Sequence, residues 1–298
     1  MHKIKLFFVI LLIGLSACTH LIKHEDPRLN ADRIRKESKL THAIIKTKSF
    51  NITSYSKDLH QETSLQGPLK SPLTIYIEGD GHAWINRYQI SNDPTPHNPL
   101  ALKLAVLDPN PNVVYLARPC QYTDPILDTQ CHPDYWTTAR FSETVISAMN
   151  EAVEHLKQKT KAKKIHLVGF SGGAAVAILI AGRRQDIASI RTVAGDLDHA
   201  ELSRYHKTTP LTQSLNPKEV IQKIAHIPQH HFVGDKDPIV PLFLSQNFIN
   251  EIEISKQTSK ANTNTQCAKR TVLKNVTHHQ GWEERWVELL EIPITCNN

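Results

Sequence analysis

The fold of this chain is decided by one stretch, Ile165-His166-Leu167-Val168-Gly169-Phe170-Ser171-Gly172-Gly173-Ala174-Ala175. Residues 165–168 predict a short buried strand, and the small and aliphatic residues 172–181 predict a compact helix. The pattern Gly-x-Ser-x-Gly between them is typical of a sharp strand-to-helix turn with the serine at its apex. Such a turn strains the backbone of Ser171 and exposes its hydroxyl group, which makes Ser171 a candidate nucleophile. A phosphate-binding turn is the alternative, but the stretch lacks a P-loop lysine and the G-x-G-x-x-G spacing.

Strand and helix patterns alternate on both sides of this turn, which predicts an α/β fold with a mostly parallel, doubly wound sheet and helices on both faces. The expected strands are residues 49–55 (an edge strand), 73–77, 112–117, 165–168, 190–194, 231–233 and 271–276. The expected helices are residues 142–158, 172–181 and a terminal helix from about Trp282. Residues 93–99 and 197–217 are expected to be loops that shape a substrate cleft.

A serine nucleophile needs a base, and the base needs an orienting acid. The stretch Phe232-Val233-Gly234-Asp235-Lys236-Asp237-Pro238-Ile239-Val240-Pro241 resembles the acid loop of α/β-hydrolases. On that resemblance Asp237 is the acid, with Asp235 and then Asp196 as alternatives. The base is expected in Thr277-His278-His279-Gln280-Gly281-Trp282, which follows the last strand. The H-x-x-G-W spacing, counted from His278, resembles the closing motif of related bacterial hydrolases, and that resemblance favours His278 over His279.

An oxyanion needs two N–H donors. The first is expected from Gly172, directly after the candidate nucleophile. The second is expected from Asp80, in the loop Glu78-Gly79-Asp80-Gly81-His82 after the strand at 73–77. Many esterases begin this loop with His-Gly, and here Glu78 stands in the place of that histidine.

These segments, with Leu116-Ala117-Arg118-Pro119-Cys120-Gln121-Tyr122, resemble a family of proteobacterial α/β-hydrolase lipoproteins over about residues 70–290. The resemblance implies the α/β-hydrolase fold and serine hydrolase chemistry without a metal or other cofactor, and it does not imply a substrate.

The N-terminus carries an export pattern. Lys3 and Lys5 precede an apolar run, residues 6–15, that is too short for a comfortable membrane span. Leu15-Ser16-Ala17-Cys18 resembles a bacterial lipobox, which implies removal of residues 1–17 and acylation (palmitate-type) of Cys18. Residue 19 is Thr rather than Asp, which by the same resemblance favours the outer membrane. Residues 18–48 are polar and predict a tether, followed by one hydrolase domain at residues 49–298.

Four cysteines remain when Cys18 carries lipid, an even number that suits an oxidising compartment. The pairing Cys120–Cys131 and Cys267–Cys296 is favoured over the two other connectivities, and no CxxC or HxxxH pattern supports a metal site. The domain is therefore expected in the periplasm or at the cell surface.

Composition leaves the substrate open. The net charge of +6 is attributed to solvated surfaces, because no run of Lys and Arg and no RNA-binding aromatic motif supports a nucleic-acid partner. The sequence predicts a monomeric, lipid-anchored serine esterase. An acyltransferase, a peptidase or a non-catalytic binding lipoprotein on the same fold are the alternatives. With 6% aromatic residues and no extended apolar lid visible, small or medium acyl esters are favoured.

Overall fold

An eight-stranded sheet forms the centre of the chain. The computed structural model describes residues 26–57, 59, 72–123, 128–258 and 266–296. The strand order is β1-β2-β6-β3-β7-β8-β9-β10, in which β1, β2 and β6 pair antiparallel and all later neighbours pair parallel. The strands are β1 (Thr41–Lys46), β2 (Asn51–Ser56), β3 (Leu73–Ile77), β6 (Val113–Leu116), β7 (Ile165–Phe170), β8 (Ile187–Val193), β9 (Gln229–Gly234) and β10 (Ala268–Leu273). A separate hairpin pairs β4 (Trp84–Asn86) with β5 (Gln89–Ile90).

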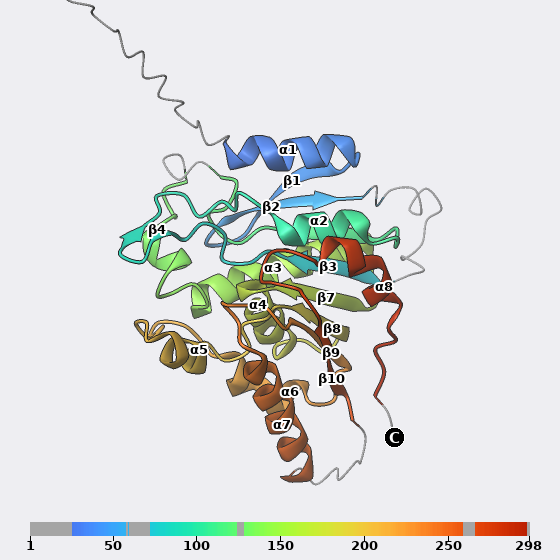
Figure 1. The fold of residues 1–298 in the computed structure, drawn as a ribbon. Helices are drawn as coiled ribbons and strands as arrows, with labels where there is room; N and C mark the ends of the chain where they lie inside the picture. Colours follow the sequence, from blue (N-terminus) through green and yellow to red (C-terminus); the bar gives the residue numbers. More distant parts are fainter. Residues whose placement is uncertain (1–25, 58, 60–71, 124–127, 259–265, 297–298) are drawn as a thin grey trace, which may run out of the picture.

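Helices cover both faces of this sheet (Figure 1). The α-helices are α1 (Pro27–Glu37), α2 (Leu100–Leu107), α3 (Glu143–Thr160), α4 (Gly172–Ala181), α5 (His199–His206), α6 (Ile221–Ile224), α7 (Leu242–Thr258) and α8 (Trp286–Glu291). The 3₁₀ turns are η1 (Pro133–Trp136), η2 (Pro217–Val220) and η3 (Glu283–Arg285). One apolar core holds residues of α3, α4, α6 and α7, and a second holds residues of α1, α2 and α8.

The central strand β3 shows why both faces must be covered. All five of its residues are buried, and successive side chains of a strand point to opposite faces. Ile75 and Ile77 accordingly lie in the first core and Tyr76 lies in the second. Parallel strands buried on both faces are typical of doubly wound folds, so the predicted α/β architecture is confirmed.

The domain begins earlier than the sequence predicted. Residues 1–17, Cys18 and residues 19–25 lie outside the described residues, but residues 26–48 of the expected tether belong to the fold. Asp26 caps α1 by accepting from the Arg28 N–H, and Ala31 is fully buried against the second core. The strand β1 then pairs with β2 over six residue pairs. The strand expected at 49–55 is therefore not the edge of the sheet, because β1 lies outside it.

The expected loop over residues 197–217 is also partly wrong, because it contains α5. Asp198 caps this helix by accepting from the N–H groups of Ala200 and Glu201. The segment 93–99 has no helix or strand, as expected.

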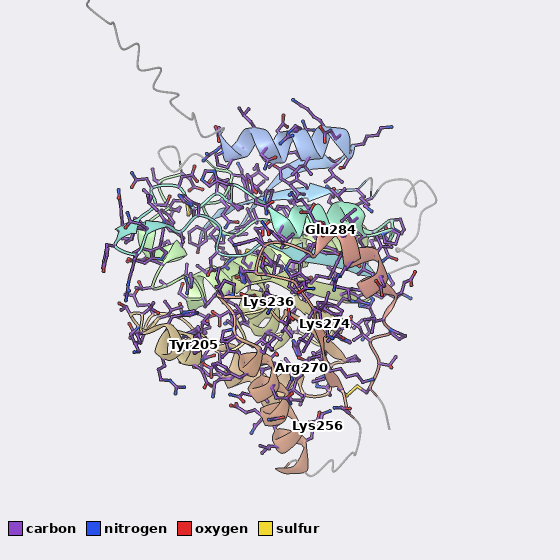
Figure 2. The ribbon with its side chains drawn as sticks, in the orientation of Figure 1. Tyr205, Lys236, Lys256, Arg270, Lys274 and Glu284 are labelled. Atoms are coloured by element: carbon purple, nitrogen blue, oxygen red, sulfur yellow. A yellow bond between two sulfur atoms is a disulfide. The ribbon has the colours of Figure 1, made fainter. Side chains whose placement is uncertain are left out.

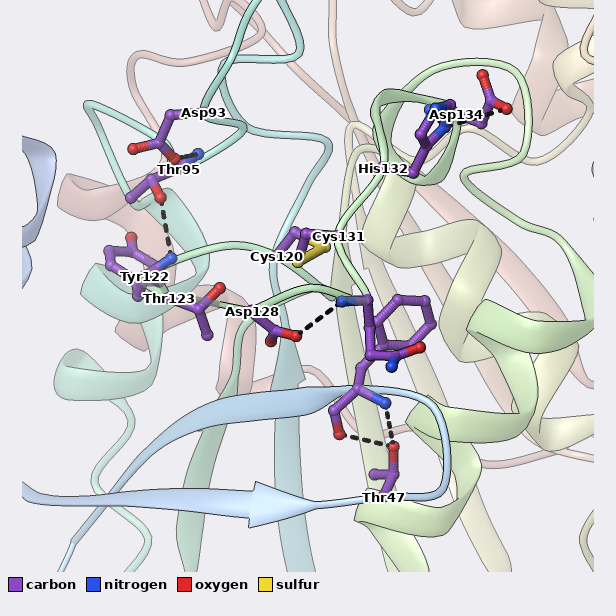
Figure 3. Close-up of a disulfide and its surroundings, with 12 residues drawn as sticks. Thr47, Asp93, Thr95, Cys120, Tyr122, Thr123, Asp128, Cys131, His132 and Asp134 are labelled. Carbon is purple, nitrogen blue, oxygen red and sulfur yellow. Dashed lines mark hydrogen bonds and ion pairs between the residues drawn. A yellow bond between two sulfur atoms is a disulfide. The ribbon is translucent and has the colours of Figure 1, made fainter. Parts of the chain in front are cut away.

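Both predicted disulfides are present. Cys120 pairs with Cys131 across 11 residues, and Cys267 pairs with Cys296 across 29 residues. Figure 3 shows the first bridge beside Asp128, whose carboxylate accepts the Gln130 N–H at 3.3 Å.

The C-terminal edge strand β10 carries basic side chains. Figure 2 labels Arg270 of β10, Lys274 directly after it and Lys236 after the neighbouring strand β9. Charged side chains on an edge strand discourage pairing with another chain. No helix within the described residues is long and apolar enough to cross a membrane.

Candidate active site

Ser171 stands at the sharp turn between β7 and α4. Its φ of 51° lies in the left-handed region that non-glycine residues rarely adopt. A Cβ at Gly169 would lie 2.4 Å from the Gly173 oxygen and 2.6 Å from the Ala174 nitrogen. Only glycine therefore fits where the strand and helix backbones meet, and the partly exposed Ser171 side chain is held at the carboxyl end of β7.

The structure brings Ser171, His278 and Asp237 together in one hydrogen-bonded row. The Ser171 Oγ lies 3.0 Å from His278 Nε2, and His278 Nδ1 lies 2.8 Å from Asp237 Oδ2. The Asp237 side chain is 1% exposed and that of His278 is 4% exposed. Because an ionised carboxylate only accepts hydrogen bonds, Nδ1 carries the proton and Nε2 is free to accept the Ser171 hydroxyl.

The loops after β9 and β10 hold this row in place. The second oxygen of Asp237 accepts the N–H groups of Ile239 (2.8 Å) and Val240 (2.9 Å). The indole N–H of Trp282 is shared between the carbonyl oxygens of Thr277 and His278. The Trp in the H-x-x-G-W spacing thus fixes the backbone that presents the imidazole.

The alternatives that the sequence left open lie elsewhere. The His279 ring packs against Phe170 and His278 at 5.7 and 4.7 Å between ring centroids, and partial burial lowers its pKa. The Asp235 carboxylate accepts the Asn275 N–H at 2.6 Å, which joins the loops after β9 and β10. Asp196 is buried, and its backbone N–H donates to the Ser171 carbonyl oxygen at 3.1 Å.

The loop after β3 lies against the turn that carries Ser171. A Cβ at Gly79 would lie 3.3 Å from the Ser171 Cβ, and a Cβ at Gly172 would lie 2.0 Å from Asp80 Oδ1. Gly172 is the first residue of α4, where N–H groups have no partner within the helix. The two residues expected to donate to an oxyanion, Asp80 and Gly172, are therefore in contact beside Ser171.

Glu78, which stands in the place of the histidine in the His-Gly pattern, has a structural role in this loop. Its carboxyl group is fully buried and accepts the Gly79 N–H (3.0 Å), the Ala101 N–H (3.4 Å) and the Tyr115 hydroxyl (3.1 Å). Burial raises the pKa of Glu78 to about 7. The carboxyl group thereby connects the loop after β3 to α2 and β6.

Two arginines, Arg118 and Arg140, hold the Asp80 side chain, and neither was predicted to have a role in the site. Arg118 Nη1 lies 3.3 Å from Asp80 Oδ1, and Arg140 Nη1 lies 3.2 Å from Asp80 Oδ2. Arg118 also donates to the Arg140 carbonyl oxygen, and burial lowers its pKa to about 10. We call Asp80, Arg118 and Arg140 the Asp80 clamp.

The charges of the Asp80 clamp affect the pKa of Asp196, which lies close by. Burial raises the pKa of Asp196 to about 7, with Arg140 opposing the rise and Asp80 adding to it. Its Oδ1 has no hydrogen-bond partner among the described residues. Arg140 comes from an irregular segment with no motif, and only its position in space relates it to the site.

A cavity of about 580 Å³ opens over Ser171. Its walls come from the loop after β3, the segment 93–99, the irregular segment that carries Arg140, the turn at Ser171 and the loops after β9 and β10: Glu78, Asp80, Gly81, His82, Ala83, Trp84, Pro96, His97, Asn98, Arg140, Phe170, Ser171, Ile239, His278 and His279. The segment 93–99 shapes the cavity as expected, whereas residues 197–217 contribute nothing to its lining. In the described ranges, no group of three His, Cys, Asp or Glu side chains is arranged to hold a metal ion.

Solved structures with the same fold include several hydrolases. Est1E from Butyrivibrio proteoclasticus has a TM-score of 0.56 at 15% identity, covering 84% of this chain and 95% of that one. The esterase Pf2001 of Pyrococcus furiosus has a TM-score of 0.56 at 14% identity, covering 86% and 90%. An alpha-beta serine hydrolase homologue from Coxiella burnetii has a TM-score of 0.50 at 18% identity, covering 85% and 94%.

No family model and no curated protein matches the sequence. The similarity to the solved structures establishes that the chain has the α/β-hydrolase fold, as the sequence motifs implied.

Proposed function

We propose that this protein is a serine hydrolase that cleaves ester bonds, with Ser171 as nucleophile, His278 as general base and acid, and Asp237 as the orienting acid. The observation that carries the proposal is the pair of hydrogen bonds through one imidazole, 3.0 Å to Ser171 and 2.8 Å to Asp237, at the wall of an open cavity. That arrangement activates a hydroxyl that is otherwise a weak nucleophile.

The proposed reaction uses each group in turn. Ser171 Oγ bonds to the ester carbonyl carbon while its proton passes to His278 Nε2, and the carbonyl oxygen takes the negative charge. The N–H groups of Gly172 and Asp80 stabilise that oxygen, a contribution worth about 100- to 1000-fold in rate per donor. The intermediate then breaks its bond to the alcohol oxygen, which takes the proton from His278.

Water completes the cycle on the acyl-enzyme. His278 accepts a proton from the water as its oxygen attacks the acyl carbon, and returns a proton to Ser171 Oγ as the acid leaves. Asp237 stays ionised throughout and stabilises the imidazolium. No metal or other cofactor takes part in these steps.

The location of the protein is part of the same proposal. Cys18 is proposed to carry lipid that anchors the chain to the envelope, with the outer membrane favoured, and the domain is proposed to lie in the periplasm or at the cell surface. The two disulfides support an oxidising compartment. The catalytic domain is proposed to act as a monomer on small-molecule ester or acyl substrates.

Hydrolysis of p-nitrophenyl acetate by purified wild type and Ser171→Ala tests the proposal. The wild type is expected to release nitrophenol with an initial burst, since the acyl-enzyme accumulates, and Ser171→Ala is expected to show no burst and little turnover. Equal rates for the two proteins, with both folded by circular dichroism, would favour a non-catalytic binding protein. A burst with product release that rises with added alcohol would favour an acyltransferase.

A further inference from the structure

The hairpin β4–β5 leaves large apolar side chains in solvent. The exposed fractions are 42% for Trp84, 51% for Ile85, 87% for Tyr88 and 38% for Ile90. Trp84 and Ile90 are cross-strand partners, so their side chains share one face of the hairpin. This apolar element was not predicted from the sequence; it follows the loop after β3 and lies at one side of the molecule in Figure 1.

The hairpin is held in place at both ends. At its tip the Asn86 side chain accepts the N–H groups of Tyr88 (2.9 Å) and Gln89 (3.1 Å). At its base the Ser91 N–H donates to the Ala83 carbonyl oxygen at 3.0 Å, and the buried Trp136 indole donates to the Ser91 carbonyl oxygen at 3.0 Å. These bonds fix the hairpin backbone in the conformation in which its apolar side chains are exposed.

The exposed apolar surface continues into the cavity over Ser171. Trp84 belongs to both, and Ala83 at the base of the hairpin also lines the cavity. Ile239, from the loop that carries Asp237, lines the same cavity and is 41% exposed. Two separate loops therefore place apolar side chains at the mouth of the cavity.

We propose that the hairpin and Ile239 bind the part of the substrate's hydrocarbon chain that extends out of the cavity. The substrates are then amphiphilic esters with a medium or longer chain. This inference rests on the proposed function. A cavity of about 580 Å³ is of the size that takes a small molecule, and Trp84 extends its wall into solvent. A protein partner bound to the same side chains would cover the mouth of the cavity over Ser171. A hydrocarbon chain of the substrate can contact these side chains while the ester group lies beside Ser171.

Chain-length series test this inference. Wild type, Trp84→Ser, Ile239→Ser and the double variant are assayed with p-nitrophenyl esters of two to ten acyl carbons and with alkyl acetates of two to ten alkyl carbons, all below their micelle-forming concentrations. In one of the two series the wild-type kcat/KM is expected to rise about 3-fold per methylene group, near the value for burying one methylene. The ratio of the eight-carbon to the two-carbon substrate is expected to fall at least 10-fold in the double variant.

Val287→Ser is the matched control, because Val287 is 47% exposed on α8 and does not line the cavity. Its chain-length ratio should equal that of the wild type. A flat wild-type dependence in both series, or a slope that survives in the double variant, overturns the inference while leaving the esterase proposal intact. A loss seen only with substrate in phospholipid vesicles overturns it in favour of a membrane-docking surface. Absence of turnover by wild type on every ester of both series overturns the proposed function and this inference together.

Discussion

Replacing Gly172 by alanine is expected to damage catalysis through Asp80 and to leave the fold intact. A Cβ at this position would lie 2.0 Å from Asp80 Oδ1 and 2.6 Å from its Cγ. The Asp80 carboxylate is also held by Arg118 at 3.3 Å and Arg140 at 3.2 Å. The new methyl group therefore pushes on the Asp80 clamp and on the loop proposed to supply an oxyanion donor.

The size of the effect follows from the distances. Ordinary contact begins at 3.4 Å, so moving Oδ1 from 2.0 to 3.4 Å displaces it by about 1.4 Å. A misplacement of about 1 Å in a catalytic group can cost about 100-fold in rate, and loss of one oxyanion donor costs about 100- to 1000-fold. We expect kcat for p-nitrophenyl acetate to fall about 100- to 1000-fold, with KM changed far less.

A double-mutant cycle separates this route from a general disturbance of α4. Asp80→Ala removes the side chain that the new methyl group strikes, so Gly172→Ala should cost less than about 5-fold in that background, a strong coupling between the two sites. Gly182→Ala, directly after α4, adds the same methyl group away from the site and should leave kcat unchanged. The reasoning is refuted if Gly172→Ala keeps the wild-type kcat, or if its cost is the same with and without the Asp80 side chain.

Three further outcomes are expected. His278→Gln should lower kcat by about 10⁴-fold or more and His279→Gln by less than about 10-fold; steady-state hydrolysis measures both, and the reverse ranking would make His279 the base. Burial raises the pKa of Asp196 to about 7, so between about pH 4 and 7 the native state keeps a proton that the unfolded chain loses. The free energy of unfolding should therefore fall by a few kcal/mol as pH rises through that interval, and less so in Asp196→Asn; parallel urea-denaturation profiles for the two proteins would contradict this. Replacing Cys120 and Cys131 by serine should cost about 3 kcal/mol of unfolding free energy, the chain-entropy value for a loop of this length, and an unchanged urea midpoint would contradict it.

The centre of the sheet could be predicted because its signals are local. An apolar strand, a glycine-flanked serine and a small-residue helix adjoin in sequence, and the structure places β7 and α4 at 165–170 and 172–181. The acid and base loops each follow a strand, and parallel strands bring those loops to one edge. The order of the segments, together with the resemblance of the acid loop and of the H-x-x-G-W spacing to those of α/β-hydrolases, therefore identified Asp237 and His278.

The N-terminal part of the domain was missed because α1 is polar and only Ala31 is buried on it. Tertiary contacts stabilise it, including the Arg28–Asp93 ion pair at 2.6 Å. The cap of Asp26 followed by Pro27 was a readable signal for a helix start.

The helix α7 was also not predicted, although the sequence carries a signal for it. Its residues Leu244, Phe248 and Ile252 recur at helical spacing and are buried.

The Asp80 clamp and the hairpin β4–β5 had no readable signal. Arg118 and Arg140 lie 22 residues apart, and the sequence does not reveal that both reach one carboxylate. The strands of the hairpin are too short to show an alternation of apolar and polar residues. The exposure of an apolar side chain is a property of the folded chain and cannot be seen in the sequence. The Asp80 clamp holds the loop proposed to supply an oxyanion donor, and the hairpin is proposed to bind the hydrocarbon chain of the substrate.

The most direct test of the central claim is site-mapped labelling with a fluorophosphonate probe. The folded wild type should gain one adduct, and peptide mapping should place it on Ser171. Ser171→Ala should gain none, and His278→Gln should react far more slowly because the hydroxyl loses its base. A wild type that stays unlabelled, or an adduct that persists in Ser171→Ala, would contradict the assignment of Ser171 as the nucleophile.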